Sequence, residues 1–476
     1  MPRHTQRERE RKLAGGAELL DQLDGEPIQS RVFTSTYFDT ADRRLLRRGV
    51  TLRRRVEHGR SQWQLKLPQA SGRLEVEADG GPVPPIEIYE LLTAYLGGRK
   101  LAPAATMRTR RQGVRVRDDD GEAEVSADAV AILEGTREVD AFDELEVELV
   151  DGDETLLDVL ERRLHAAGAH RSADEVKLER ALGAAPPLPD DPPPPSAPPL
   201  EHLLFQIRRQ YEAIIRNDPG VRLAVDPEAV HDMRVATRRL RAMLRAAGEM
   251  LAPEWSEPLR DELKWLAGEL APLRDADVFL EYLREETADF EGEDRVGADE
   301  LIGLLEAERG AAHARAVAAL RSERYLALLQ ELERTARAPR VRSASVPLDG
   351  IARREFRKLR KAALKITADS PDHEVHRLRI RGKRARYAAE LADTAVGKRA
   401  RQFLKHARNF QDVVGEHQDA VVAEEHLRAL QERGGREAAL AAGRLVERQG
   451  MRRRRAREEL AAAWAELDEA GRQAWR

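Results

Sequence analysis

Residues 231–241 read HDMRVATRRLR, and this stretch indicates how the second half of the chain folds. Its basic residues stand at offsets of 0, 3, 7 and 10, which puts them on one face of a helix: His231, Arg234, Arg238 and Arg241. Met233, Ala236 and Leu240 lie on roughly the opposite side. The stretch therefore predicts a helix with an apolar back for packing and a front of imidazole and guanidinium groups.

This basic face occurs twice in the chain. The same four offsets recur at a second set, His376, Arg379, Lys383 and Arg386. The repeat has a spacing of about 145 residues and also relates Arg209 to Arg354. With a spacing one residue shorter, it relates LRDA at 273–276 to HQDA at 417–420. A duplication of this length predicts a pseudo-two-fold helical bundle in which the two basic faces meet at the centre.

Amphipathic patterns fill the rest of the second half. They predict helices at residues 201–216, 228–250, 256–270, 275–287, 297–320, 323–336, 350–367, 372–392, 397–414, 416–432 and 435–472. A proline-rich stretch, AAPPLPDDPPPPSAPPL at 184–200, precedes them, and such sequence forms an extended spacer. We therefore expect a first domain at 5–182, a linker at 183–200 and a helical domain at 201–476.

The first half carries short segments in which apolar and charged residues alternate. They predict strands at residues 32–37, 51–56, 62–67, 73–77, 114–117 and 144–149, with a short helix at 156–167. A single strand of this kind is typical of an antiparallel sheet with one wet face. Several strands whose second face holds Arg, Lys or Glu suggest instead a closed barrel with a charged lumen.

Composition limits the classes of function. The 476 residues suffice for two domains, and the absence of cysteine excludes disulfides and thiolate zinc sites. A net charge of −4 argues against a general nucleic-acid-binding protein, so we do not expect specific nucleic-acid binding. No apolar run approaches the length of a membrane span, and the charged N-terminus does not resemble a secretory signal. We expect a cytoplasmic protein that makes no membrane contact.

The N-terminal run Glu8-Arg9-Glu10-Arg11-Lys12 places two carboxylates and an ammonium on one face of a strand. By composition alone, such a charged run is more often disordered. The predicted lumen changes this balance because it supplies more groups of both signs: Glu75, Glu77, Glu144, Glu146, Glu148, Arg53, Arg55, Lys66 and Lys177. Carboxylates hold Mg²⁺, and Arg and Lys donors hold phosphate oxygens. The combination suits phosphoryl transfer.

These residues resemble the CYTH domain of the triphosphate tunnel metalloenzymes over about residues 5–182. The matching pieces are ERERK at 8–12, TYFDTADRRLLRRGVTLRRR at 36–55, WQLKLP at 63–68, the ELEVEL strand at 144–149 and VKLERAL at 176–182. The resemblance implies an antiparallel eight-stranded tunnel that binds a triphosphate with Mg²⁺ or Mn²⁺.

The same resemblance implies roles for individual residues. The catalytic residues are expected to be Glu8, Glu10 and Lys12, and the metal ligands to be Glu8, Glu10, Glu144, Glu146 and Glu148. The expected triphosphate-binding residues are Lys12, Arg53, Arg55, Lys66, Arg111 and Lys177. Asp128 is a further acidic candidate, and Arg108 and Arg110 remain alternatives to Arg111.

The second half resembles the CHAD domain over about residues 200–476, through HDMRVATRRLRA, APLRDADV and HRLRIRGKRARYAAE. That family is associated with inorganic polyphosphate, and rows of guanidinium groups suit a flexible polyanion. The predicted polyphosphate-binding residues are His231, Arg234, Arg238, Arg241, Arg354, Lys358, His376, Arg379, Lys383 and Arg386. A second interpretation of His231 and His376 has equal weight: each histidine bonds Asp275 or Asp419 and only orients its neighbours.

The sequence thus predicts an α+β chain of two domains, an antiparallel eight-stranded β-tunnel followed by an all-α duplicated bundle. We expect a metal-dependent hydrolase of inorganic triphosphate that also binds polyphosphate, with an association with polyphosphate granules. One alternative is a polyphosphate-binding protein with an inactive tunnel. Another is ATP cyclisation or thiamine triphosphate hydrolysis on the same fold, for which Trp63 and Tyr37 are the aromatic candidates near the tunnel.

Overall fold

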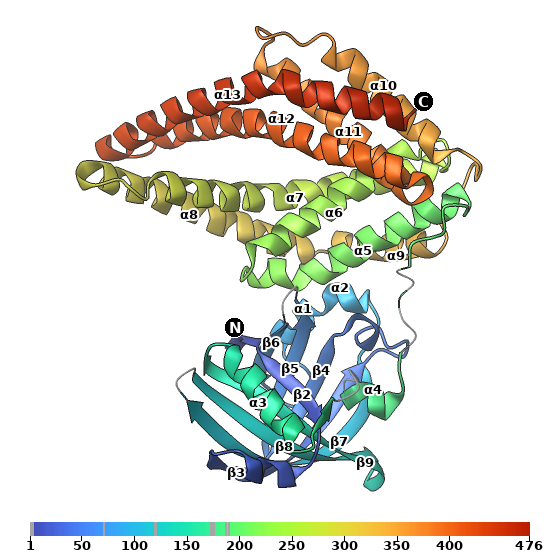
Figure 1. Ribbon diagram of the computed structural model, residues 1–476, viewed down its shortest axis with the longest axis vertical. Helices are drawn as coiled ribbons and strands as arrows, with labels where there is room; N and C mark the ends of the chain where they lie inside the picture. The colour runs from blue at the N-terminus through green and yellow to red at the C-terminus, as the bar shows by residue number, and fades with distance from the viewer. Residues whose placement is uncertain (1–3, 70–71, 119–120, 172–176, 186–187, 189–190) are drawn as a thin grey trace. The chain divides into compact units, whose positions relative to one another are not determined.

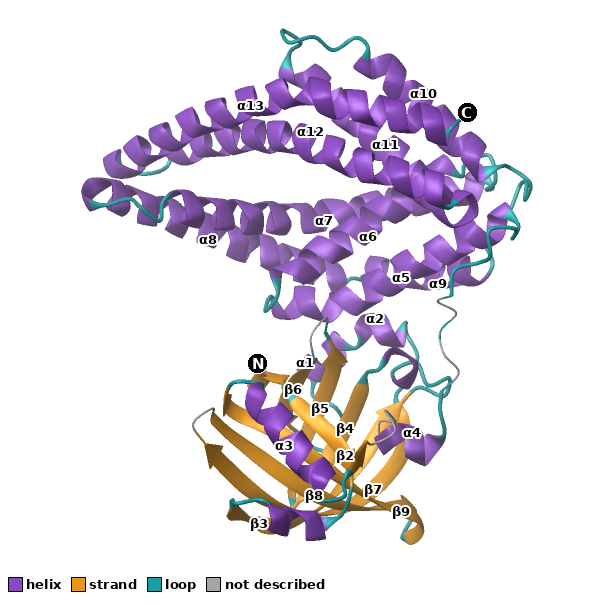
Figure 2. Cartoon of the chain, in the orientation of Figure 1, coloured by secondary structure: helices purple, strands orange, loops and turns teal. Residues whose placement is uncertain are grey.

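The computed structural model describes residues 4–69, 72–118, 121–171, 177–185, 188 and 191–476 (Figures 1 and 2). The chain divides into two compact units, residues 1–189 and residues 190–476. An antiparallel sheet forms the body of the first unit, and the second unit is built from long helices.

Ten strand segments form the sheet of the first unit. They are β1 (His4–Glu8), β2 (Glu10–Ala14), β3 (Glu26–Asp39), β4 (Thr51–Glu57), β5 (Arg60–Pro68), β6 (Arg73–Asp79), β7 (Ala102–Asp118), β8 (Gly121–Glu134), β9 (Arg137–Gly152) and β10 (His170–Arg171). Their order is β1-β6-β5-β4-β3-β7-β8-β9-β2-β10, and every neighbouring pair is antiparallel.

The N-terminal strand closes this sheet on itself. Its first part, β1, pairs with β6, whereas its second part, β2, pairs with β9 at the other end of the row. Arg9 separates the two parts, and its carbonyl accepts a hydrogen bond from the Leu149 amide at 3.0 Å. With β1 and β2 counted as one strand and the two-residue β10 set aside, the result is the predicted eight-stranded antiparallel barrel.

The apolar faces of the strands point away from the lumen and are covered by helices. The 3-10 helix η1 (Ala17–Gln22) and α3 (Thr155–Ala166) pack on β2, β8 and β9 through an apolar cluster that includes Leu13, Val125, Leu145 and Leu160. On the opposite wall Trp63 is fully buried, with its ring centre 4.8 Å from that of Phe38. Along the charged segments the barrel is therefore polar inside and apolar outside, as the alternation predicted, although the apolar Met107 and Val130 share the strand faces of Arg111 and Asp128.

Short elements complete the first unit: the 3-10 helix η2 (Leu46–Arg48), α1 (Ile86–Leu91), α2 (Thr93–Leu96) and α4 (Lys177–Leu182). Leu178 of α4 packs with Tyr37, Met107 and Val130 in an apolar cluster. This packing places Lys177, the first residue of α4, next to the charged lumen.

The second unit consists of nine helices among the residues described. They are α5 (Pro199–Leu223), α6 (Pro227–Ala246), α7 (Pro253–Glu286), α8 (Gly292–Leu320), α9 (Glu323–Arg337), α10 (Leu348–Ala363), α11 (Asp372–Val396), α12 (Lys398–Gln431) and α13 (Arg436–Ala474). The two predicted basic faces lie on α6 and α11, which contact each other. The hairpins α7–α8 and α12–α13 pack through an apolar cluster that includes Leu280, Leu305, Leu427 and Leu445.

Two predicted helix breaks are wrong. The segments 256–270 and 275–287 are one helix, α7, with Pro258 and Pro272 inside it, and the segments 397–414 and 416–432 are one helix, α12. Buried residues continue on both sides of each predicted break, for example Leu270 and Leu273 beside Pro272. The packing of a long apolar face therefore outweighs the local cost of proline.

Across the described residues, no helix combines the length and the apolar character needed to cross a bilayer.

Candidate functional site

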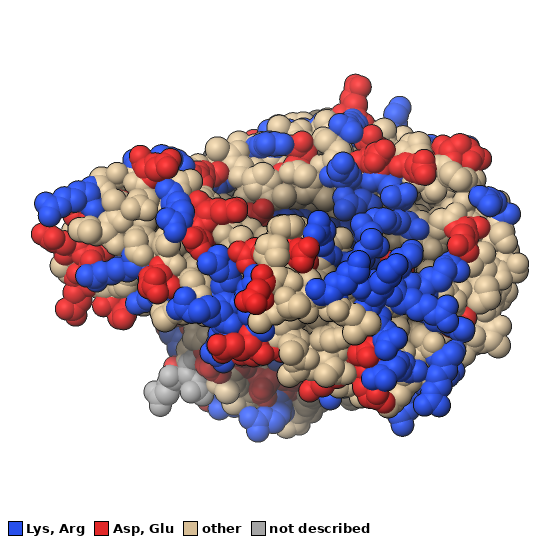
Figure 3. Space-filling model, turned by 90° about the horizontal axis from the view of Figure 1, so that it is seen from above, with Lys and Arg blue, Asp and Glu red and all other residues tan. Residues whose placement is uncertain are grey.

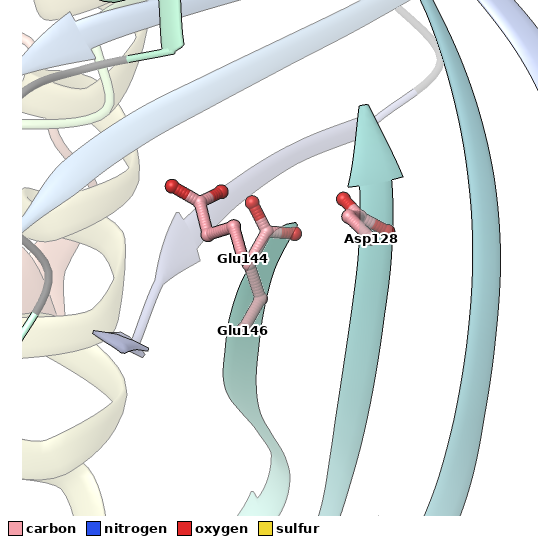
Figure 4. Close-up of side chains that lie close together, drawn as sticks. All are labelled: Asp128, Glu144 and Glu146. Carbon is pink, nitrogen blue, oxygen red and sulfur yellow. The ribbon is translucent and has the colours of Figure 1, made fainter. Parts of the chain in front are cut away.

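Three carboxylates of the barrel lie close together on two adjacent strands (Figure 4). Asp128 of β8 and Glu144 and Glu146 of β9 lie on adjacent strands, and one oxygen from each lies within 4.8 Å of the others. The Nζ atom of Lys177 lies 2.7 Å from Asp128, 2.8 Å from Glu144 and 2.9 Å from Glu146. This arrangement concentrates charges of both signs in a space with little water.

Two further cations complete the neutralisation of these acids. Arg111 of β7 donates from Nε and Nη2 to the two oxygens of Asp128, each at 2.7 Å, and also bonds Glu146. The Nζ atom of Lys12 lies 3.2 Å from Glu10 and 3.6 Å from Glu146. The forked donation by Arg111 fixes the plane of the Asp128 carboxylate.

Titration behaviour in the lumen follows from these contacts. Burial alone would raise the pKa of Glu146, but Lys177, Arg111 and Lys12 hold it well below its usual range. Burial alone would lower the pKa of Lys177, yet Glu146, Asp128 and Glu144 raise it above its ordinary value. Both groups are therefore charged at neutral pH.

A second acidic region lies on the neighbouring strands. Glu10 of β2 is the register partner of Glu148 on β9, and Glu75 of β6 is the partner of Lys66 on β5. Burial raises the pKa of Glu148; Lys66 opposes this rise, whereas Glu75 and Glu10 add to it. These acids repel one another, and a cation bound between them would relieve the repulsion.

Arginines of β4 form the basic wall of the lumen. Arg53 donates to Gln64 at 2.6 Å and to the Tyr37 hydroxyl at 3.4 Å. Arg55 donates to Glu57 at 2.6 Å, and its guanidinium carbon lies 3.7 Å from the centre of the Phe33 ring. Both side chains are thus held in fixed directions before any ligand binds.

The structure separates the three candidate arginines of β7. Arg111 contacts the lumen acids, whereas Arg108 is exposed and lies 3.8 Å from Glu138, and Arg110 is also exposed. Glu8 pairs with Arg73 through its backbone, but its side chain lies outside the described atoms, so its predicted roles stay predictions.

The aromatic expectation for Trp63 is wrong. Its indole lies on the outer face of the barrel and donates to the Gly81 carbonyl at 3.0 Å. Trp63 and Leu65 are two residues apart on β5, so their side chains lie on the same, outer face of the strand. The Trp63 ring therefore cannot stack on a ligand inside the lumen.

The donor set of the central site suits a hard divalent cation. Asp128, Glu144 and Glu146 supply carboxylate oxygens and could hold a metal ion of the Mg²⁺ type. Asp128 was a subsidiary candidate in the sequence, yet it belongs to this cluster together with the predicted ligands Glu144 and Glu146. The Lys177 ammonium contacts all three acids, so a cation at this position has to compete with it.

The helical unit contains a basic cavity of about 790 Å³. Its cationic lining comes from four helices: Arg238, Arg241 and Arg245 of α6, Arg260 and Lys264 of α7, Arg354 and Lys358 of α10, and Arg379, Lys383 and Arg384 of α11. Glu249, Asp261 and Glu355 are the acids of the lining. In the space-filling view, Lys and Arg gather in one continuous cluster, whereas elsewhere on that face they alternate with Asp and Glu (Figure 3).

The predicted polyphosphate-binding residues divide into two groups. Six of them line the cavity: Arg238, Arg241, Arg354, Lys358, Arg379 and Lys383. The remaining four, His231, Arg234, His376 and Arg386, are not part of its lining. Arg234 instead pairs with Asp275 at 2.6 Å, and Arg386 with Glu390 at 3.1 Å.

His376, one of the two histidines, has a partner other than the aspartate predicted for it. His376 Nδ1 lies 2.5 Å from the side-chain oxygen of Gln418, not from Asp419. Asp275 and Asp419 lie instead beside arginines of the two basic faces, Arg234 at 2.6 Å and Arg379 at 3.7 Å. The duplication in sequence therefore reproduces an Arg–Asp pair.

Lys383 has the most unusual electrostatic environment of the cavity. Burial, together with the neighbouring charges of Arg379 and Arg238, lowers its pKa from 10.5 to about 7, and Asp419 offsets this only in part. Burial also lowers the pKa of Arg238. A cavity that crowds like charges is stabilised when an anion enters it.

Sequence reasoning missed several residues of this cavity. Arg260 and Lys264 lie on α7, outside the duplicated face, and no repeat pointed to them. Arg245 stands four residues after Arg241 on the same helix, so extending the basic face by one more turn would have included it. Arg384 directly follows Lys383 in the sequence.

The chain thus combines a polar-lined β-barrel with a duplicated helical unit that contains a basic cavity. Residues 6–182 match the CYTH domain family and residues 205–428 match the CHAD domain family, so the chain belongs to the CYTH–CHAD proteins. The CYTH family binds triphosphate substrates and depends on metal ions.

Similar proteins occur both among known sequences and among solved structures. An uncharacterised protein of Mycobacterium tuberculosis, found in strains CDC 1551 and H37Rv, is 32% identical over 494 aligned positions, which cover 96% of this chain and 94% of the relative. The CHAD domain from the plant Ricinus communis is 29% identical and covers 59% of this chain and 96% of its own, with a TM-score of 0.49. PptA from Streptomyces chartreusis is 24% identical and covers 56% of this chain and 100% of its own, with a TM-score of 0.47.

Proposed function

We propose that the barrel hydrolyses inorganic triphosphate with a divalent cation, Mg²⁺ or Mn²⁺, and that the helical cavity binds inorganic polyphosphate. The observation that carries the proposal is the contact of Lys177 with Asp128, Glu144 and Glu146 inside a closed polar lumen. A site with acids for a cation and bases for phosphate can hold both halves of a metal–triphosphate complex.

The acids would hold the cation. The proposed ligands are the three carboxylates of the central cluster together with the second acidic region, Glu10 and Glu148. When bound, the ion neutralises phosphate charge and lowers the barrier to attack by water. With these carboxylates engaged by the cation, the Lys177 ammonium would be a donor to phosphate.

The bases would hold the triphosphate along the basic wall. Arg53 and Arg55 are already oriented by Gln64 and Phe33, so they lose little side-chain entropy when a phosphate binds. Lys12, Lys66 and Lys177 supply compact positive charges at the acidic side of the lumen. Arg111 is bonded to Asp128 and Glu146, and we assign it the positioning of these acids rather than direct phosphate contact.

The reaction consumes one water and converts triphosphate into pyrophosphate and orthophosphate. We propose that Glu10 orients the attacking water, since its carboxylate lies 3.2 Å from Lys12, a predicted phosphate ligand. Base stacking, which a cyclase would need, finds little support in the lumen. Trp63 lies outside it, and the Tyr37 hydroxyl already accepts from Arg53.

The helical cavity has the properties of a polyanion holder. Its cations come from four helices and outnumber its acids, so a flexible chain of phosphates can contact several of them at once. No acidic cluster of the kind found in the barrel occurs among the described residues of this unit. We therefore assign binding, without cleavage, to this cavity.

The proposal is tested by phosphate release from triphosphate with Mg²⁺ or Mn²⁺. The Glu146→Gln variant is expected to lose about 100-fold or more of the rate, because it removes a charge that contacts the site directly. Glu138→Gln, on the same strand but exposed, is the matched control and should keep the full rate. If the full-length protein releases no phosphate from triphosphate, the result would favour the alternative hypothesis of a polyphosphate-binding protein with an inactive tunnel.

A further inference from the structure

A second cavity of about 620 Å³ lies at the β4–β5 hairpin of the barrel. Arg31 and Arg55 line its inner part, and His58 and Arg60 are the exposed residues of the hairpin. Only Arg55 among them belongs to the predicted triphosphate site. The cavity therefore raises the question of what the other basic groups bind.

Arg31 and Arg55 form a pair of like charges in this cavity. The Nε atoms of both residues are buried, and no described group accepts a hydrogen bond from either atom. Burial, opposed by Glu57, and the positive charges of Arg53 and Arg31 lower the pKa of Arg55. Two neighbouring guanidinium groups with unused donors are stabilised by an anion that bridges them.

The Phe33 ring connects this pair with the central site. The guanidinium carbon of Arg55 lies 3.7 Å from its centre, and that of Arg111 lies 5.8 Å from it. Arg53 and Arg55 are two residues apart on β4 and therefore about 7 Å apart along the strand. Basic groups thus continue from the acids of the lumen to the hairpin.

The acids of the cavity do not cancel this charge. Glu57 is bonded to Arg55 at 2.6 Å, and Asp79 is exposed. Against these two carboxylates stand three arginines and a histidine. A single phosphate group at the end of a longer chain would balance the remaining charge.

We propose that Arg31, Arg55 and Arg60 form an outer phosphate subsite, which holds the far end of a linear polyphosphate longer than triphosphate while its near end lies at the central acids. This inference rests on the proposed function of the barrel and extends its substrate class to longer inorganic chains. It assigns a binding role to Arg31 and Arg60, which the triphosphate site does not use.

The first test compares the KM of the full-length protein for inorganic triphosphate and for linear inorganic tetraphosphate. Arg31→Gln should raise the KM for tetraphosphate about tenfold through the loss of a charge-assisted contact. Its KM for triphosphate should change less than about twofold. Arg60→Gln, on the exposed hairpin where folding is not at risk, should show the same selectivity with a smaller effect.

Arg108→Gln is the matched control, because Arg108 is an exposed arginine of β7 that lies 3.8 Å from Glu138 and is not part of the lining of this cavity. It should leave both KM values unchanged. An equal rise for both substrates in Arg31→Gln, or no rise for either, would overturn the subsite.

A second measurement does not depend on turnover. Phenylglyoxal modification of Arg31 and Arg60, followed by peptide mass spectrometry, should be slowed by tetraphosphate and much less by triphosphate. Equal protection by the two anions, or none, would contradict the subsite. If the wild-type protein cleaves neither anion yet shows the selective protection, the proposed hydrolysis fails and the subsite stands.

Discussion

Lys177 in the barrel and Lys383 in the helical unit are both largely buried lysines, yet their surroundings shift their pKa values in opposite directions. Three carboxylates contact Lys177 and raise its pKa. Burial and three neighbouring arginines lower the pKa of Lys383 to about 7. The barrel thus supplies its own anions next to its lysine. The acids of the helical cavity, Glu249, Asp261 and Glu355, are outnumbered by its cations, and this excess favours the binding of an anion.

The largest expected effect comes from removal of divalent cations, because we propose a metal site in the barrel and none in the helical cavity. Chelation should reduce triphosphate hydrolysis to background, and added Mg²⁺ or Mn²⁺ should restore it. Polyphosphate binding, measured on the same sample by filter retention, should persist through the treatment. A loss of binding in parallel with turnover would show that both units need the metal.

Lys177→Met tests the neutralisation of the central acids. Removal of one partner from a buried ionic cluster costs about 3–5 kcal/mol, so the variant should unfold at a lower temperature than the wild type. Mg²⁺ should raise the melting temperature of the variant more than that of the wild type, because it replaces the lost charge. Calorimetry with and without Mg²⁺ measures both effects, and an equal Mg²⁺ response would contradict the proposed metal position.

The double variant Arg238→Ala, Lys383→Ala tests the basic cavity. Loss of two charge-assisted contacts should weaken polyphosphate binding by about 10- to 100-fold, while triphosphate hydrolysis stays at the wild-type rate. Arg455→Ala, an exposed residue of α13 paired with Glu459, is the control and should bind normally. Unchanged affinity in the double variant would place the polyphosphate site elsewhere.

The smallest expected effect is a pH dependence of that binding. Lys383 gains its proton below about pH 7, and the charged groups that face it are Arg379, Arg238, Arg386 and Asp419. The affinity for polyphosphate should therefore rise by about two- to tenfold from pH 8 to pH 6, since a bound anion favours the protonated amine. The affinity for polyphosphate, measured as a function of pH, should change less steeply in Lys383→Met than in the wild type. The same pH dependence in both proteins would mean that it comes from the titration of the polyphosphate itself.

Much of the barrel could be predicted from the sequence because its alternation has a period of two. The positions of Glu144, Glu146, Arg53 and Arg55 on one face followed directly from the strand pattern. The placement of Asp128 beside Glu144 did not, because it depends on the register of β8 against β9. A strand pattern gives the face of a side chain but not its neighbour on the next strand.

The helical unit was less predictable for a related reason. The duplicated pattern placed Arg238 and Lys383 on facing helices, and both line the cavity. The contribution of α7 through Arg260 and Lys264 depends on tertiary packing, which no local pattern of that helix reveals. Likewise, Pro272 predicted a break that the buried neighbours Leu270 and Leu273 override.

A phosphorus NMR time course of the full-length protein with Mg²⁺ and triphosphate tests most directly whether the barrel hydrolyses triphosphate. The account predicts that the triphosphate signals fall while orthophosphate and pyrophosphate rise in equal amounts, and that Glu146→Gln nearly abolishes this change. Persistence of triphosphate in the wild type, or the same time course in Glu146→Gln, would contradict it.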